Sequence, residues 1–172
     1  MRFSTIFAAA TALPLMLAAG TALALDAPKG ASATLKDAAG NTAGTVTLMD
    51  MGDHLMGKID ATGLKPGAHG IHIHMVGACT APDFASAGGH LNPTGKKHGL
   101  DNPDGAHQGD LPQLVAGDDG KASASFTAHS TMAAIMDSDG SAFVVHADAD
   151  DQKTDPSGNS GSRILCGVFT KG

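Results

Sequence analysis

Six histidines and one aspartate in this chain have side chains of the kinds that bind metal ions. They are His72, His74, His90, His98, His107, Asp110 and His146. Imidazole groups suit zinc and copper, and the set lacks the sulfur ligands that a zinc finger uses. One four-coordinate ion needs only four donors, so this set is too large for a single ion. Two ions could share it if one histidine served both.

The spacing of the donors divides them into two overlapping sets. His72 and His74 lie two residues apart in a segment that is expected to be a strand, so both side chains leave the same face. His146 ends another expected strand, and His90 from a loop could complete four nitrogens. We call these four residues the nitrogen set. The second set, which we call the mixed set, consists of His90, His98, His107 and Asp110. Its three nitrogens and one oxygen are a plausible tetrahedral zinc site.

Both sets need His90. An imidazole ring can bind one ion through each nitrogen if it loses both protons, and two divalent cations make this possible because they strongly depress the pKa of a ligand. The nitrogen set then suits copper, and the mixed set suits zinc. His54 and His129 have no such neighbours in the sequence, and we expect them to be surface residues.

Short segments that alternate apolar and polar residues predict a β-rich fold. Turn signals such as 118–120 and 139–140 separate these segments, and their spacing indicates a β-sandwich or barrel, for which we expect about eight antiparallel strands. The expected strands are 33–35, 44–49, 54–59, 70–74, 121–126, 142–146 and 163–169. Two long stretches, 77–110 and 148–162, do not fit strands and are expected to be functional loops.

The N-terminal residues have the pattern of a secretory signal peptide. Arg2 precedes an apolar stretch from Ile6 to Leu17, and small residues at Ala22 and Ala24 suit a signal peptidase. A retained membrane anchor is the alternative, but the stretch is rich in alanine and broken by proline and glycine, so it is a weak span. We expect cleavage near Ala24, which divides the chain into a signal peptide over 1–24 and a single domain over 25–172.

The charge balance excludes one class of partner. Cleavage removes one of the 11 basic residues, Arg2, and leaves 10 basic and 17 acidic residues, a net charge of −7. This chain has no basic footprint for nucleic acid, and no such partner is expected.

The two cysteines, Cys79 and Cys166, are expected to form a disulfide in an exported chain. That bond could stabilise the fold by about 4–5 kcal/mol. Two buried free thiols are the alternative. The wide separation of the cysteines argues against a thioredoxin-like redox pair.

Several motifs resemble those of exported bacterial copper/zinc superoxide dismutases. The matching segments are 70–74, 88–93, His98, 105–112, 145–151 and 161–168. The resemblance spans nearly the whole mature chain. It implies a Greek-key β-sandwich or flattened barrel and a periplasmic enzyme that converts superoxide to dioxygen and hydrogen peroxide.

The resemblance also implies a role for particular residues. It assigns copper to His72, His74, His90 and His146, and zinc to His90, His98, His107 and Asp110, with His90 as the bridge. It implies that Asp150 links a copper histidine to a zinc histidine, that Cys79 and Cys166 pair, and that His69 is a structural hydrogen-bonding residue. Arg163, the only arginine left after cleavage, matches the family arginine beside copper, where a guanidinium can hold a small oxyanion.

The chain departs from the family pattern at two positions. Met75 and Leu91 stand where a glutamate and an aromatic residue are usual, and neither is a ligand position. Four more acids are expected to be solvated loop residues: Asp101, Asp104, Asp148 and Asp155. Lys153 is a possible further attractant for an anion.

In the implied chemistry, copper changes valence, zinc does not, and His90 carries a proton. The expected partner is superoxide, with no stable membrane association and a possible homodimer. Copper carriage without turnover and zinc hydrolysis are the competing functions. Arg163 and the shared His90 argue against a carrier, and the four donors of the mixed set leave no open position for hydrolysis.

Overall fold

A computed structural model describes residues 30–172 of the chain. The predicted signal peptide lies outside the described residues. Within residues 30–172, no helix is both long enough and apolar enough to cross a membrane.

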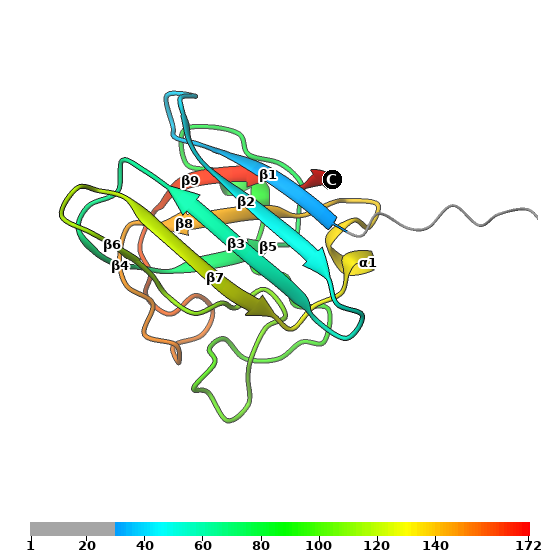
Figure 1. Cartoon of the computed structure of the whole chain (residues 1–172). Coiled ribbons are helices and arrows are strands. Elements are labelled where there is room, and N and C mark those ends of the chain that lie inside the picture. Colours follow the sequence, from blue (N-terminus) through cyan, green and yellow to red (C-terminus); the bar gives the residue numbers. More distant parts are fainter. Residues whose placement is uncertain (1–29) are drawn as a thin grey trace, which may run out of the picture.

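Antiparallel strands make up most of the regular structure (Figure 1). The strands are β1 (Gly30–Lys36), β2 (Thr42–Asp50), β3 (Leu55–Ala61), β4 (Gly67–His69), β5 (Ile71–His74), β6 (Leu114–Ala116), β7 (Ala122–Ala128), β8 (Ala142–His146), β9 (Arg163–Val168) and β10 (Thr170–Lys171). The described helices are two short ones, the 3-10 helix η1 (Ala85–Ala87) and α1 (Met132–Ile135).

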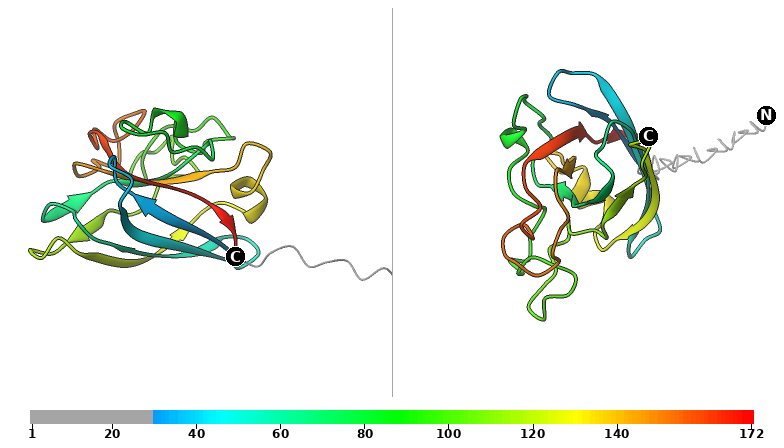
Figure 2. Two further views of the ribbon diagram at one scale, coloured as in Figure 1. Left: turned by 90° about the horizontal axis from the view of Figure 1, so that it is seen from above. Right: turned by 90° about the vertical axis from the view of Figure 1, so that its left-hand side faces the viewer.

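The main sheet has the strand order β5-β8-β9-β1-β2-β3-β7, and β10 pairs with β1. It curls so that β1, β2, β3 and β7 form one layer and β5, β8 and β9 form the other (Figure 2). Along the main sheet, the chain crosses between the layers after β3, after β5 and after β7, which gives the Greek-key connections that the family resemblance implied. A separate pair, β4 and β6, lies beside β7.

The core lies between the two layers and follows from the period-two pattern of the strands. In β3, Leu55, Gly57, Ile59 and Ala61 are buried and the residues between them are exposed. Burial of a side chain as large as Leu55 or Ile59 stabilises the fold by about 1.5–3 kcal/mol. In β5 and β8 every residue is buried, because long loops cover the outer side of that layer.

The expected strands all appear, with ends that differ by a few residues. The segment that was expected only to begin the sheet, 33–35, is the middle of β1. The sequence did not predict β4, β6, β10 and α1, which have two to four residues each and are too short to show a period. Both predicted long loops lie outside the strands, and the first contains η1.

Candidate metal centre

The free edge of β5 organises the loop that carries most of the donors. Ile73 donates its N–H to Gly109 O at 2.9 Å, and Leu91 donates its N–H to Ile73 O at 2.8 Å. Gly109 in turn donates to Leu91 O at 2.9 Å. A Cβ at Gly109 would overlap Ile73 O, so this three-way contact requires glycine.

These contacts set the register of the loop against the two strand histidines. Isolated β-bridges pair His72 with Asp110 and His74 with His90. The sequence placed His72 and His74 on one face of a strand, and the backbone pairing places a loop donor opposite each of them.

His146 reaches the same region through an irregularity in the sheet. The register of β8 against β9 shifts between Val145 and His146, and His146 then pairs with Arg163. A bulge of this kind redirects the side chain that follows it. The His146 ring packs 4.8 Å from the His72 ring and 5.8 Å from the His74 ring, measured between centroids.

The structure brings the four histidines of the nitrogen set together with one ring nitrogen each directed inward. One nitrogen from each ring lies within 4.8 Å of the others. Four buried ring nitrogens in the described residues have no hydrogen-bond partner: Nδ1 of His72 and Nε2 of His74, His90 and His146. An unpartnered buried polar atom costs about 1–3 kcal/mol, so four together call for a ligand. Four converging lone pairs suit a cation that prefers nitrogen, such as copper.

Hydrogen bonds at the other ring nitrogens hold three of these lone pairs in place. His72 Nε2 donates to Asp150 Oδ2 at 2.6 Å, His74 Nδ1 to Gly88 O at 2.9 Å, and His146 Nδ1 to Gly161 O at 3.2 Å. An acceptor at one nitrogen fixes the proton there and leaves the other nitrogen free to bind a metal.

The mixed set converges on one oxygen of Asp110. Its Oδ1 lies 2.9 Å from His90 Nδ1, 2.9 Å from His98 Nδ1 and 3.3 Å from His107 Nδ1. His107 Nδ1 is also 3.4 Å from His90 Nδ1. Two lone pairs on one oxygen cannot serve three N–H donors well. Ligand atoms around a tetrahedral zinc ion lie about 3.3–3.4 Å apart, so these four atoms suit zinc.

The remaining oxygen of Asp110 is committed to the backbone. Oδ2 accepts the N–H groups of Gly99 at 2.8 Å and His107 at 2.9 Å. The carboxylate is therefore rigid, and the loop turn is tied to the side chain that faces the three histidines.

A second cluster of donors differs from the mixed set at one position. Ligand atoms of His72, His90, His98 and Asp110 lie within 4.8 Å of one another, and His107 is not part of that cluster. We nevertheless place His72 in the nitrogen set, because its Nδ1 is unpartnered and its Nε2 donates to Asp150.

Asp150 connects the two sets by contacting one histidine of each. Its Oδ2 accepts from His72, and its Oδ1 lies 3.1 Å from His98 Nε2. A Cβ at Gly158, where φ is +63°, would overlap Asp150 Oδ1. Gly158 is therefore needed for the carboxylate to reach both rings.

Burial and hydrogen bonding give the two sets opposite electrostatic characters. Burial lowers the pKa of His72 to about 3 and of His146 to about 4, and it also lowers the pKa values of His74 and His90. These rings are neutral near pH 7, as metal ligands must be.

The carboxylates have the opposite effect on His98. Burial lowers the pKa of His98, but hydrogen bonds to Asp110 and Asp150 outweigh it and raise the pKa to about 9. Burial raises the pKa values of both aspartates, and their hydrogen bonds to histidines lower them well below the usual range. The mixed set therefore favours a positive charge at its centre.

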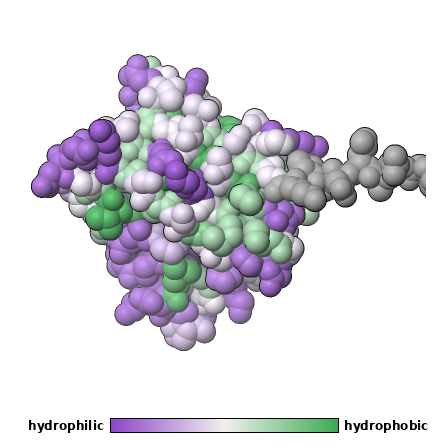
Figure 3. All heavy atoms as spheres, in the orientation of Figure 1, coloured by the Kyte–Doolittle hydropathy of each residue, from purple (hydrophilic) through white to green (hydrophobic). Residues whose placement is uncertain are grey.

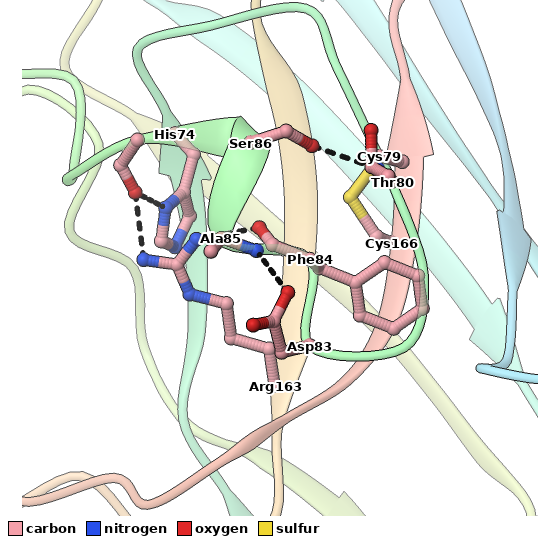
Figure 4. The surroundings of a disulfide bond; sticks show 10 residues. His74, Cys79, Thr80, Asp83, Phe84, Ala85, Ser86, Arg163 and Cys166 are labelled. Carbon is pink, nitrogen blue, oxygen red and sulfur yellow. Dashed lines mark hydrogen bonds between the residues drawn. A yellow bond between two sulfur atoms is a disulfide. The ribbon is translucent and has the colours of Figure 1, made fainter.

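A cleft opens over the nitrogen set. His74, His90 and His146 line it together with Met75, Lys96 and Arg163. Arg163 donates from Nη1 to Phe84 O and from Nη2 to Gly88 O, both at 2.7 Å. Figure 4 shows Arg163 and His74 reaching the same backbone carbonyl, which is that of Gly88. The guanidinium is thus held at the edge of the cleft.

The predicted disulfide is confirmed and anchors the loop that holds Arg163. Cys79 and Cys166 are bonded, with their Cα atoms 5.7 Å apart. Phe84 packs beside Cys166 in a small buried cluster (Figure 4). The bond therefore ties the loop carrying the Phe84 and Gly88 carbonyls to β9, the strand that also carries Arg163.

Other sequence predictions have mixed outcomes. His69 is buried and bonds to His146 O at 2.7 Å and Lys65 O at 2.8 Å, which confirms its structural role. His129 is exposed and His54 partly exposed, as expected of surface residues. Asp155 is more than a solvated loop acid, because it accepts the His98 N–H at 2.8 Å.

The cation that accompanies Arg163 in the cleft is Lys96, and Lys153 is not among the residues that line it. The sequence contains no signal that separates these two loop lysines, because their positions depend on how the two long loops fold against each other.

Comparisons with known proteins agree with this geometry. A family model described as copper/zinc superoxide dismutase (SODC) matches residues 42–169. The superoxide dismutase-like protein YojM of Bacillus subtilis is 51% identical over 118 residues, a match that spans 64% of this chain and only 60% of that protein. The copper/zinc superoxide dismutase of Caulobacter vibrioides is 42% identical, over 81% of this chain and 84% of the relative.

A crystal structure of a superoxide dismutase-like protein from Bacillus subtilis superposes with a TM-score of 0.76. It is 43% identical and covers 80% of this chain and 96% of its own. The family model matches most of the chain, and the Caulobacter relative is similar over most of its length. The chain belongs to the copper/zinc superoxide dismutase family.

Proposed function

We propose that this protein dismutates superoxide at a centre in which the nitrogen set holds copper, the mixed set holds zinc, and His90 belongs to both. The observation that carries the proposal is the placement of the two His90 nitrogens. Nε2 is one of the four unpartnered atoms of the nitrogen set, and Nδ1 lies among the atoms that surround Asp110 Oδ1.

The chain prepares both sets before any ion binds. When bound, copper supplies reversible one-electron transfer, and zinc, which has no redox chemistry, supplies a fixed positive charge. Asp150 and the carbonyls of Gly88 and Gly161 orient the rings of the nitrogen set, and Asp110 fixes the mixed set. Little reorganisation is then needed on binding.

His90 has the position of a proton carrier. His90 lines the cleft, where the substrate arrives; its Nε2 belongs to the nitrogen set beneath, and its Nδ1 faces Asp110. A proton held at Nε2 is within reach of a small anion in the cleft. The mixed set keeps the ring in place while that proton comes and goes.

The cleft attracts an anion although the chain as a whole is acidic. Two divalent cations contribute four positive charges, and Asp110, Asp150 and an imidazolate at His90 subtract three. Arg163 and Lys96 add two positive charges and Asp155, which also lines the cleft, subtracts one, so the local charge is about +2. This field acts within a Debye length of about 8 Å at physiological salt. The more distant acids are largely screened.

The same proposal includes export to the periplasm. The N-terminal pattern, the disulfide and the bacterial relatives support it, because disulfides form and persist in oxidising compartments.

One experiment on the purified mature chain tests the activity and the shared histidine together. Superoxide decay is measured beside copper and zinc content, and the expected result is rapid decay with one ion of each metal per chain. Both sets are then loaded with copper(II), whose unpaired electrons couple through a shared ring and weaken the electron paramagnetic resonance signal. His90→Ala should restore the signal, and His129→Ala, at an exposed histidine, should not. Uncoupled copper in the native chain would contradict the shared role of His90.

Decay no faster than with metal-free protein, at full metal content, would overturn the proposed activity itself. His146→Ala should loosen copper and lower activity while zinc remains. Full activity with unchanged copper content in that variant would remove His146 from the nitrogen set.

A further inference from the structure

A second group of soft metal donors lies on the outer face of the β2–β3 hairpin. It consists of Met49, Met51, His54 and Met56, which we call the methionine hairpin. Three of the chain's eight methionines fall within the eight residues 49–56. Met49, Met51 and Met56 are 61%, 53% and 39% exposed, whereas Met132 is buried in the core.

The strand register places Met49 and Met56 on one face, and the turn between β2 and β3 carries Met51 and His54. Met49 pairs directly with Met56 across the hairpin. The Met51 N–H donates to His54 O at 3.0 Å, so those two residues also face each other across the turn. Leu48 and Leu55 point into the core, so the neighbouring Met49 and Met56 point outward, and Met51 in the turn is also exposed. Directly opposed residues have Cβ atoms about 4.5–5.5 Å apart, which flexible thioether arms can close around one ion.

His54 is oriented as metal-binding histidines are. Its Nδ1 lies 2.6 Å from Asp53 Oδ1, which fixes the proton on that nitrogen. Its Nε2 has no hydrogen-bond partner among residues 30–172 and is left as a free acceptor. A carboxylate behind a ligating histidine is the usual arrangement in metal sites.

The composition of this surface differs from that of an ordinary apolar patch. Elsewhere on β2 and β3 the outward positions are polar or charged, with Thr45, Thr47, Lys58 and Asp60. Figure 3 shows a weakly apolar area on the side facing the viewer, where β2 ends and β3 begins. All exposed large apolar side chains of the methionine hairpin are thioethers. The exposed residues Asp50 and Asp53 lie next to them in the sequence.

We propose that the methionine hairpin binds one copper(I) ion through its three thioether sulfurs and His54 Nε2. Thioether and imidazole ligands favour copper(I) over magnesium, calcium and manganese, which prefer oxygen. The adjacent carboxylates of Asp50 and Asp53 add attraction for a cation. The site lies on the β1–β2–β3–β7 layer, whereas His72, His74 and His146 come from β5 and β8 in the other layer (Figure 2). It is therefore separate from the metal centre and does not depend on the proposed function.

The test uses the full mature chain with its copper and zinc already bound. Copper(I) is added without oxygen as its complex with a coloured chelator, and transfer to the protein is followed as loss of colour. The native chain should take up one further equivalent. The triple variant Met49→Leu, Met51→Leu, Met56→Leu keeps the apolar surface and should lose that equivalent. Met75→Leu, at an exposed methionine outside the hairpin, should keep it.

A second measurement identifies the ligand atoms. Silver(I), which is redox-inert and similarly soft, should shift the methyl resonances of Met49, Met51 and Met56 and leave that of Met136 unchanged. Superoxide decay and melting temperature of the triple variant should match those of the native chain. Equal uptake of copper(I) by the native chain and the triple variant would overturn the proposal. The proposal would also be overturned if neither the native chain nor the triple variant took up the further equivalent of copper(I). Dimerisation of both proteins through the methionine hairpin would then be the alternative role of this surface.

Discussion

Removal of the disulfide should cost both stability and activity, by separate routes. Cys79 and Cys166 are 87 residues apart in the chain, and the chain-entropy model gives about 4.6 kcal/mol for closing a loop of that length. The double variant Cys79→Ala, Cys166→Ala is preferred to serine, because Cys166 is 1% exposed and a hydroxyl there would be buried. The expected loss is about 4.6 kcal/mol in the metal-free protein.

Urea unfolding of the metal-free protein measures this loss. The chain has no tryptophan and no tyrosine, so circular dichroism of the β-structure is the suitable signal. With a slope of about 2 kcal/mol per molar urea, the midpoint should fall by about 2 M. A fall below about 0.5 M would refute the reasoning, since it would mean that the bond does not restrict the unfolded chain as the model requires.

Activity should fall for a different reason. The tethered loop supplies Phe84 O and Gly88 O, which hold the Arg163 guanidinium. Superoxide decay per bound copper should therefore decrease in the double variant even at full metal content. Ser86→Ala, which removes only the contact from the Thr80 N–H, is the matched control within the same loop. It should cost about 1 kcal/mol and leave activity per copper unchanged.

Three further outcomes test the supports of the metal centre. Asp150→Asn should lower metal affinity by about 10–100-fold, measured by chelator competition, while Asp148→Asn at an exposed position should not. Gly158→Ala should destabilise the protein by about 1–2 kcal/mol because φ is positive there, and it should also reduce metal content because the added Cβ would overlap Asp150. Gly40→Ala, the control at an open position with positive φ, should reduce stability alone. Arg163→Glu should slow superoxide decay most at low ionic strength, and a slowing that is the same at all salt concentrations would remove its role in attracting the anion.

The sequence was sufficient for features that depend on local period and residue chemistry. Alternation along 54–59 predicted the buried face of β3, and a spacing of two placed His72 and His74 on one face. The kinds of donor favoured copper and zinc, and the presence of only two cysteines in a chain with a signal-peptide pattern predicted their pairing. These features need no knowledge of which distant segments meet.

Only the tertiary structure decided how the site is completed. The contact of Asp150 with His72 spans 78 residues, and the free nitrogen of each ring depends on acceptors such as Gly88 O. The shift in register before His146 and the position of Lys96 in the cleft likewise follow from packing between distant strands and loops. Sequence alone left His54 as an isolated surface histidine, because the pairing of β2 with β3 is what sets Met49 opposite Met56 next to the turn that carries His54. Local sequence determines which way a side chain points along its own strand, whereas the atoms that it meets are determined by long-range backbone pairing.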